Sequence, residues 1–290
     1  MDLYYFCVIN KSHTMKRNII LIAALGLLFG CGNNNSQTNN PESKQEAFSV
    51  ETYDVEDSRV LATTGEGEDA HEERAFFRCT IDIPVTDNQA LYDSICNWFA
   101  QTMDKDQNED PRDVKSMVNS YKDDILKPID NDDPEGFDAS LDFEMLEAND
   151  RYVTYKRYDF NEANSAPRSN QEWVCITFNS HTGKRFTRQM VHEDDTLEEL
   201  VMNALLEQFF SDWQSDALDD ILNFDPEFLE ERGFWLPKTD PFILHDSLYF
   251  FYWEHDIANR VAGQPYCSLP FSLIEKYLTE EGKAFFKASK

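Results

Sequence analysis

The sequence predicts an α+β fold, with mostly antiparallel sheets, packed helices and two small subdomains that follow a signal peptide and a flexible tether. Stretches in which apolar and polar residues alternate indicate strands, and stretches with apolar residues three or four positions apart indicate helices. The two kinds of stretch come in separate runs, which is typical of α+β chains. Hydrophobic residues make up 41% of the chain, including 22 Phe and 12 Tyr, so there is enough apolar surface for a core.

The charge balance excludes one class of partner. The chain has 290 residues, with 26 Lys and Arg against 55 Asp and Glu, which gives a formal net charge of -29. Nucleic-acid binding depends on clustered cations that displace phosphate counterions, and a surface this negative repels a polyanion. We therefore expect no nucleic acid among the partners.

The amino terminus has the form of a secretory signal peptide. Basic residues after Met15 precede an apolar run over 19–29, and a small residue stands directly before Cys31. This order is typical of a cleaved signal, and the run is shorter than the ~20 residues that a membrane-spanning helix needs. We expect residues 1–30 to be the signal peptide, with Met15 as the true start.

Cys31 is the predicted site of lipidation. The segment Leu28-Phe29-Gly30-Cys31 resembles a bacterial lipobox, in which the cysteine thiol is acylated, with palmitate among the added chains. Acylated Cys31 would anchor the protein to a membrane. Asn-rich rather than acidic residues follow it, so we expect the outer membrane or cell envelope, on the periplasmic face. The alternative is a buried cysteine at the end of a core helix.

Residues 31–74 are predicted to form a flexible acidic tether. Residues 32–46 are rich in Asn, Ser and Gln and show no periodicity, and the stretch that follows stays acidic. The folded part would then divide into an N-terminal α+β subdomain over 75–190 and a C-terminal α+β subdomain over 191–290.

The first subdomain is expected to begin with a strand and two helices. Thr86 and Gln89 have the spacing of a capping box before the first helix, and Asp110 precedes the second as its cap. Thr182-Gly183 provides the left-handed backbone of a tight turn into a strand over 184–188. The other predicted elements are a strand over 77–83, helices over 91–103 and 110–125, and strands over 141–145, 152–160 and 172–178.

The second subdomain is expected to start with a helix whose capping box is Thr196 and Glu199. A turn at His245-Asp246 would join two strands. The predicted elements are helices over 196–209 and 213–222, strands over 242–244, 248–254 and 266–270, and short helices over 272–277 and 280–287.

Four cysteines follow the signal and Cys31, namely Cys79, Cys96, Cys175 and Cys267. An even number in an exported protein is compatible with two disulfides, and three connectivities are open. Each cysteine lies near apolar residues, so unpaired core thiols are the alternative.

Two segments carry a resemblance to a known family. Residues 174–188, with the helix after them, resemble the strand, Thr-Gly-Lys turn and helix of a bacterial extracytoplasmic family. The segment 248–278 resembles the aromatic strand and closing helix of the same family. Its members include the extracellular domain of the lysozyme-sensing anti-sigma-V factor and an accessory domain of some peptidoglycan deacetylases. The resemblance implies an envelope protein that binds a partner or senses one.

Few residues suggest catalysis. The chain has no GxSxG, HExxH or CxxC motif and no glycine-rich phosphate loop. Glu254-His255-Asp256 is the densest titratable cluster, but neighbours on a strand point to opposite faces. The acidic loops after Asp104 and Asp130 lack the Gly and Glu positions of a calcium-binding EF-hand. We predict no catalytic residue, no metal site and no cofactor.

The best candidates for an exposed binding anchor are Phe234 and Trp235, which lie in a loop between Gly233 and Pro237. Trp98 and Trp253 are predicted core residues, because they lie on an amphipathic helix and in a hydrophobic strand. The acids of His192-Glu193-Asp194-Asp195 are expected to complement the dipole of the following helix.

These observations favour a non-enzymatic, lipid-anchored envelope protein. Its domain would bind a ligand or protein, with a cationic partner such as lysozyme implied by the resemblance and cell-wall glycan as another possible partner. The alternative is an enzyme, or a deacetylase-associated accessory domain, that acts on peptidoglycan or other glycans.

Overall fold

The computed structural model describes residues 48–64, 71–104, 110–127, 136–163, 169–209, 235–254, 256–257 and 263–287. Gln45–Lys290 forms one compact unit. None of the helices in these described ranges is long and apolar enough to span a membrane. The predicted signal peptide, Cys31 and the predicted helix over 213–222 lie outside the described residues.

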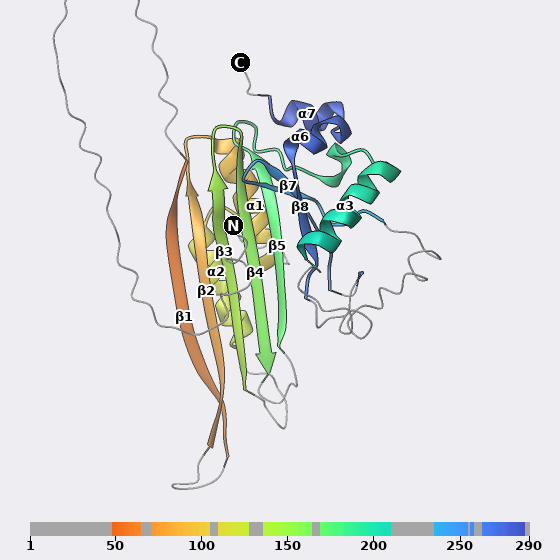
Figure 1. Ribbon diagram of the computed structural model, residues 1–290. Helices are drawn as coiled ribbons and strands as arrows, with labels where there is room; N and C mark the ends of the chain where they lie inside the picture. Colours follow the sequence, from red (N-terminus) through yellow and green to blue (C-terminus); the bar gives the residue numbers. More distant parts are fainter. Residues whose placement is uncertain are drawn as a thin grey trace, which may run out of the picture. The chain divides into compact units, whose positions relative to one another are not determined.

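Two sheets and several helices give the α+β fold that the sequence predicts (Figure 1). The larger sheet has the order β1-β2-β3-β4-β5, and all its pairs are antiparallel except β2 with β3. The smaller sheet has the order β6-β7-β8 and is antiparallel. The strands are β1 Ser49–Thr64, β2 His71–Val85, β3 Phe137–Ala148, β4 Tyr152–Ala163, β5 Asn170–Asn179, β6 Phe242–Leu244, β7 Ser247–Phe251 and β8 Tyr266–Pro270.

The tether prediction is wrong for β1. This 16-residue strand pairs antiparallel with β2 along its whole length. Two of its acids are partners of helix lysines, since Glu51 accepts from Lys115 at 2.6 Å and Asp57 lies 3.3 Å from Lys122. The acidic composition, which suggested a solvated linker, thus belongs to an edge strand, where charged side chains discourage pairing with other chains.

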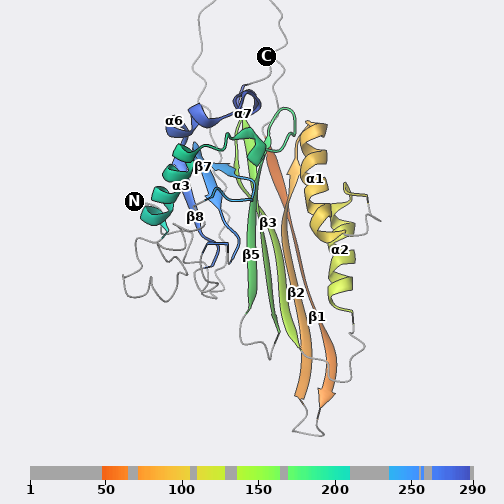
Figure 2. The same ribbon diagram turned by 90° about the vertical axis from the view of Figure 1, so that its right-hand side faces the viewer.

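One face of the larger sheet, which we call the inner face, packs against helices α1 (Gln89–Met103) and α2 (Val114–Ile125) (Figure 2). Along β2, alternate residues from Ala75 to Ile83 are buried and the residues between them are not. The predicted helix and strand periods are confirmed here. Trp98 and Phe99 of α1 lie in this core, against Phe143 and Tyr155.

The helix caps differ from the predicted ones. Asn88, rather than Thr86, caps α1, since its Oδ1 accepts from the Leu91 N–H at 3.3 Å. Its Nδ2 also donates to two carbonyls of the turn after β5, at 2.8 Å each. Asp113, rather than Asp110, caps α2. In each case the Asx residue directly before the helix can reach its first free N–H groups, which the earlier residue cannot.

Gly183 confirms the predicted left-handed turn, with a φ of +67°. A Cβ at this position would lie 2.3 Å from the Ala90 carbonyl oxygen, so the glycine also permits close contact with α1. The strand predicted over 184–188 is not present, because only Arg185 bridges back to Phe178 before the chain turns away.

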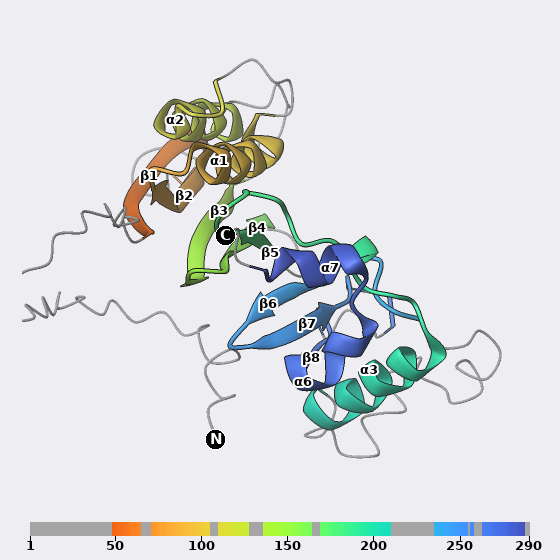
Figure 3. The same cartoon turned by 90° about the horizontal axis from the view of Figure 1, so that it is seen from above.

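The C-terminal layer comprises β6–β8 and helices α3 (Asp195–Gln208), α6 (Phe271–Ile274) and α7 (Glu280–Phe285), with short 3-10 turns η3 (Arg188–Met190) and η5 (Glu275–Tyr277). It packs on the other face of the larger sheet, over β4 and β5 (Figure 3). Thr154 donates to the Ile243 carbonyl at 2.6 Å, and the Ile243 N–H donates to Thr177 at 2.8 Å. These bonds join the two sheets.

Most elements of this layer match the prediction, with two corrections. Asp194, rather than Thr196, caps α3 through a 2.9 Å bond from the Thr196 N–H. Hydrogen bonds from the Thr196 side chain and from its N–H hold the pKa of Asp194 below its usual value. Strand β7 ends at Phe251 instead of Glu254, because the Tyr252 N–H turns to the Pro265 carbonyl. The His245-Asp246 turn is confirmed, and both residues have positive φ.

Cys79, Cys96, Cys175 and Cys267 are buried free thiols. Of the two alternatives, unpaired core thiols are the ones that the structure has. Burial raises the pKa of Cys79, Cys96 and Cys267 to about 12.

Candidate functional site

Of the predicted binding and catalytic candidates, only Glu254 lines a groove among the described residues. Phe234 and His255 lie outside those residues. Trp235 is half-buried and packs against the core of the C-terminal layer, and its carbonyl accepts from the Tyr252 hydroxyl at 2.9 Å. It is therefore a packing residue rather than an exposed anchor.

The acidic candidates have structural roles where they are described. Asp256 accepts from the Trp253 N–H at 3.1 Å and so closes a turn. No group of three or more His, Cys, Asp or Glu within the described ranges is placed to hold a metal ion. The acidic loops at 105–109 and 128–135 lie outside those ranges.

A charged surface that the sequence analysis did not identify lies on the larger sheet. Side chains of β1–β4 that point away from α1 and α2 form two cross-strand rows. Figure 1 looks onto this face of β1–β3, with the two helices behind the sheet. One row is Asp54, Thr80, Asp142 and Tyr158, and the next is Glu56, Arg78, Ser140 and Phe160.

We call this surface the acidic face. Its acids exceed its bases, Arg74, Arg78 and Lys156, and they are Asp54, Glu56, Glu72, Asp82, Asp138, Asp142, Glu144 and Glu162. Glu56 and Glu144 are exposed, and the closest contact of Glu56 with Arg78 is 3.7 Å. Exposed pairs of this kind contribute little to stability.

Aromatic side chains lie among these acids. Phe76 on β2 is 45% exposed, and Phe160 and Tyr158 on β4 are half-buried. Asp142 sits beside Tyr158, where burial raises the pKa of its carboxyl, although the Thr80 N–H donates to it at 3.1 Å. Such a mixture of exposed apolar area and charge is typical of a protein-contact surface.

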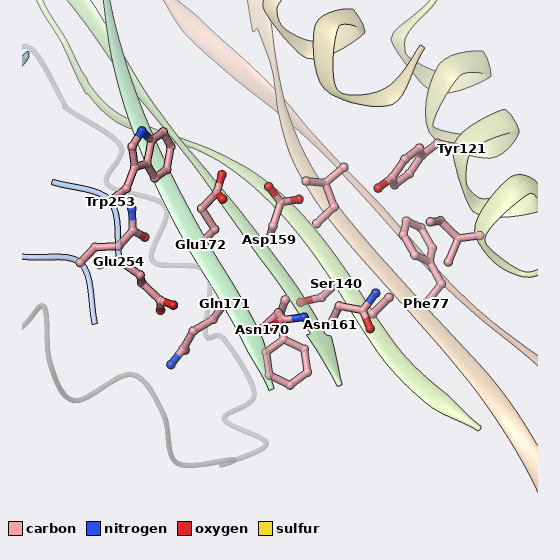
Figure 4. Close-up of a pocket in the computed structure, with 15 residues that line it drawn as sticks. Phe77, Tyr121, Ser140, Asp159, Asn161, Asn170, Gln171, Glu172, Trp253 and Glu254 are labelled. Atoms are coloured by element: carbon pink, nitrogen blue, oxygen red, sulfur yellow. The ribbon is translucent and has the colours of Figure 1, made fainter. Parts of the chain in front are cut away.

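A groove of about 480 Å³ lies beside α2, mainly on the inner face, and Ser140, Phe160 and Trp253 from the other side of the sheet also line it (Figure 4). Tyr121 lies at one end and Trp253 at the other, with Asp159 and Glu172 between them. Asn161 and Gln171 complete its polar part. The volume is within the range of small-molecule sites.

One arginine links the two carboxylates of this groove. The Arg157 Nε lies 2.6 Å from Asp159 Oδ2, and its Nη2 donates to Glu172 Oε1 at 2.6 Å. Its Nη1 donates to Thr102 of α1 at 3.2 Å. The guanidinium is therefore held by α1, β4 and β5 together.

This link opposes a glycosidase-like reaction. Paired catalytic carboxylates stand about 5–9.5 Å apart, with the scissile bond or a water between them. Here both carboxylates contact the same guanidinium, which takes the place of the reacting atoms. The pair is better suited to accepting hydrogen bonds than to acid–base catalysis.

Sequence reasoning missed both surfaces for the same reason. The acids of the acidic face come from strands far apart in the chain, and β1 was assigned to a tether. The available signal was period-two alternation, since Tyr53 and Val55 alternate with Asp54 and Glu56.

No family model and no curated protein matches the chain. Among solved structures, a DUF3298 family protein from Bacteroides fragilis is similar, with a TM-score of 0.59 and 14% identity over 85% of this chain and 100% of its own. A DUF3298 family protein from Pseudomonas aeruginosa has a TM-score of 0.51 and 13% identity over 83% and 98%. The chain thus shares the fold of a domain whose function is unknown.

Proposed function

We propose that the protein is a non-enzymatic, lipid-anchored protein of the cell envelope whose acidic face binds a cationic protein. The observation that carries the proposal is the acidic face, where acids from β1–β4 outnumber bases and where no element of the described ranges covers β1–β3 (Figure 1). The electrostatic field of an acidic surface speeds its encounter with a positively charged partner. Exposed Phe76 on the acidic face supplies apolar surface that would be buried on binding.

The anchor in this proposal is acylated Cys31, which places the domain at the outer membrane or elsewhere in the envelope, on the periplasmic face. The test is Cys31→Ala in cells, followed by membrane fractionation and fatty-acid labelling. We expect the variant to leave the membrane fraction and to lose the label. Unchanged fractionation with an unchanged label would overturn the anchor.

The binding claim is tested with lysozyme as the cationic probe. The variant Glu56→Lys/Glu144→Lys reverses two exposed charges on the acidic face, and Glu199→Lys/Glu207→Lys makes the same change on α3. We expect the first variant to slow association by about tenfold at low salt and the second by about twofold or less. Equal effects of the two variants would assign the attraction to net charge alone.

The enzyme alternative makes a different prediction. A chain that processes glycans would release product from acetylated muropeptides, and Glu254→Gln would abolish that activity. The shared guanidinium between Asp159 and Glu172 favours binding instead. Measurable turnover by the purified full chain, lost in the Glu254 variant, would overturn the non-enzymatic proposal.

A further inference from the structure

We propose that the groove on the inner face binds a neutral, hydroxyl-rich oligosaccharide. This second site differs from the acidic face in its polar residues, because Asp159, Asn161 and Glu172 are on the inner face, although Ser140 and Phe160 of the acidic face also line the groove. The inference goes beyond the proposed function and does not depend on it.

The two ends of the groove are aromatic and held in place. Tyr121 packs edge-on against Phe77, with ring centroids 5.8 Å apart, and Trp253 packs edge-on against Phe251 at 5.7 Å. Figure 4 shows the two residues on either side of the carboxylates. Rings bring large apolar area at low entropic cost, and pyranose rings present C–H faces that match such area.

The groups between the rings both donate and accept hydrogen bonds. Asp159, Glu172 and Glu254 contribute carboxylate oxygens, and the amides of Asn161 and Gln171 contribute both kinds of group. Burial and the nearby Asp159 raise the pKa of Tyr121, so its hydroxyl stays a donor at neutral pH. A sugar hydroxyl donates one hydrogen bond and accepts others, so a groove with both kinds of group suits it.

Arg157 makes a sugar a better ligand for the groove than a cation. Its guanidinium side chain is 18% exposed and already pairs with Asp159 and Glu172. A lysine-rich peptide would have to compete with this built-in cation. The carboxylates keep lone pairs for further hydrogen bonds, since an ionised carboxylate has about four acceptor sites.

The same arginine makes the site rigid before any ligand binds. Bonds to Thr102, Asp159 and Glu172 fix the polar floor of the groove from three elements. Side chains that are already ordered lose little entropy on binding, which favours even a weak hydroxyl ligand.

The test is calorimetric titration of the purified full chain in detergent with three probes. These are the tetramer of N-acetylglucosamine, the same tetramer without its acetyl groups, and tetralysine. We expect the acetylated tetramer to bind with a dissociation constant below about 1 mM and with little salt dependence, the de-acetylated tetramer, which is cationic, to bind no more tightly, and tetralysine not to bind. Asn161→Ala should weaken sugar binding about tenfold, and Trp253→Leu at least as much.

Asn203→Ala is the matched control, because Asn203 is an exposed asparagine on α3, outside the groove. It should leave sugar affinity unchanged. Asn161→Ala removes an exposed side chain, so it tests the site even if Trp253→Leu lowers stability. Glu56→Lys/Glu144→Lys should also bind sugar normally, which separates this inference from the proposed function.

Several results would overturn the inference. These are no binding of the acetylated tetramer, binding that Asn161→Ala and Trp253→Leu leave unchanged, or binding of tetralysine with loss of both sugars. Binding of the de-acetylated tetramer alone would also overturn it, because the groove would then recognise charge rather than hydroxyls.

Discussion

The acidic residues on the two faces of the larger sheet differ in how they are paired with cations. On the inner face, acids are paired with cations of the same layer, as Glu51 is with Lys115 and Asp159 with Arg157. On the acidic face, Glu72 pairs with Arg74 at 2.6 Å and exposed Glu56 lies 3.7 Å from Arg78, but the acids outnumber the bases. The same strands thus carry neutralised charge on one side and surplus charge on the other.

This difference separates structural charge from charge available for binding. Pairs that join β1 to α2, or β4 to β5, hold elements of the fold together. Surplus charge adds self-repulsion and does not hold the fold together. Four predictions sharpen the contrast, from the largest expected effect to the smallest.

The buried thiols give the largest effect. With the pKa of Cys79 and Cys96 raised to about 12, the native protein at pH 8 should react with a thiol reagent about a thousandfold more slowly than free cysteine. A thiol-specific dye, added before and after denaturation without reductant, measures this. Unreactive cysteines after denaturation would indicate disulfides instead of the free thiols.

Substitutions of two adjacent phenylalanines compare the contribution of side-chain burial to stability on the two faces. Phe77 is 2% exposed in the inner core, whereas Phe76 is 45% exposed on the acidic face. Phe77→Ala should lower the free energy of unfolding by about 3–5 kcal/mol, and Phe76→Ala by less than about 1 kcal/mol. Chemical denaturation measures both, and similar losses would mean that the acidic face is covered.

Substitutions of two arginines compare the contribution of ion pairs to stability on the two faces. Arg157→Met leaves the carboxylates of Asp159, 33% exposed, and Glu172, 47% exposed, without their shared partner and should cost about 1–2 kcal/mol. Arg78→Met removes one exposed pair and should change stability by less than about 0.5 kcal/mol. If Arg157→Met were neutral in urea unfolding, the inner network would not be structural.

Asp142 gives the smallest effect. Because burial raises its pKa in the folded state, the folded protein binds this proton more tightly than the unfolded chain does, and its ionised form lowers stability above that pKa. Asp142→Asn should therefore raise stability at pH 7 by up to about 1 kcal/mol, and the gain should shrink as the pH falls through this pKa toward 3.8.

The exposed neighbour Asp138, changed to Asn, is the control and should stay within about 0.5 kcal/mol of the unchanged protein. Thermal unfolding at several pH values measures both variants. A gain that stays constant down to pH 3 would contradict the role of Asp142.

The sequence predicted most strands and helices because their periodicity is strong. The alternation from Phe77 to Ile83 and the stripe on α1 follow directly from which residues are buried. The helix caps were harder to predict, because the choice between Thr86 and Asn88 as the cap of α1 depends on contacts with the turn after β5. Strand β1 was missed because its charges suggested solvent, although their partners lie in α2.

The sites could not be predicted from local pattern. Asp54, Asp142 and Tyr158 come together only through the register of β1–β4, including the parallel pairing of β2 with β3. Arg157 joins Asp159 to Glu172 across a hairpin whose register the sequence left open. Phe234 and Trp235 were chosen for their loop, and Trp235 packs inward.

The most direct measurement of the central claim is carboxyl footprinting of the full chain with and without lysozyme. The label modifies exposed carboxylates, and mass spectrometry reads each one. We predict that lysozyme protects Asp54, Glu56 and Glu144 of the acidic face and leaves Glu199 and Glu207 of α3 as reactive as before. Equal protection at both places, or protection on α3 alone, would contradict binding through the acidic face.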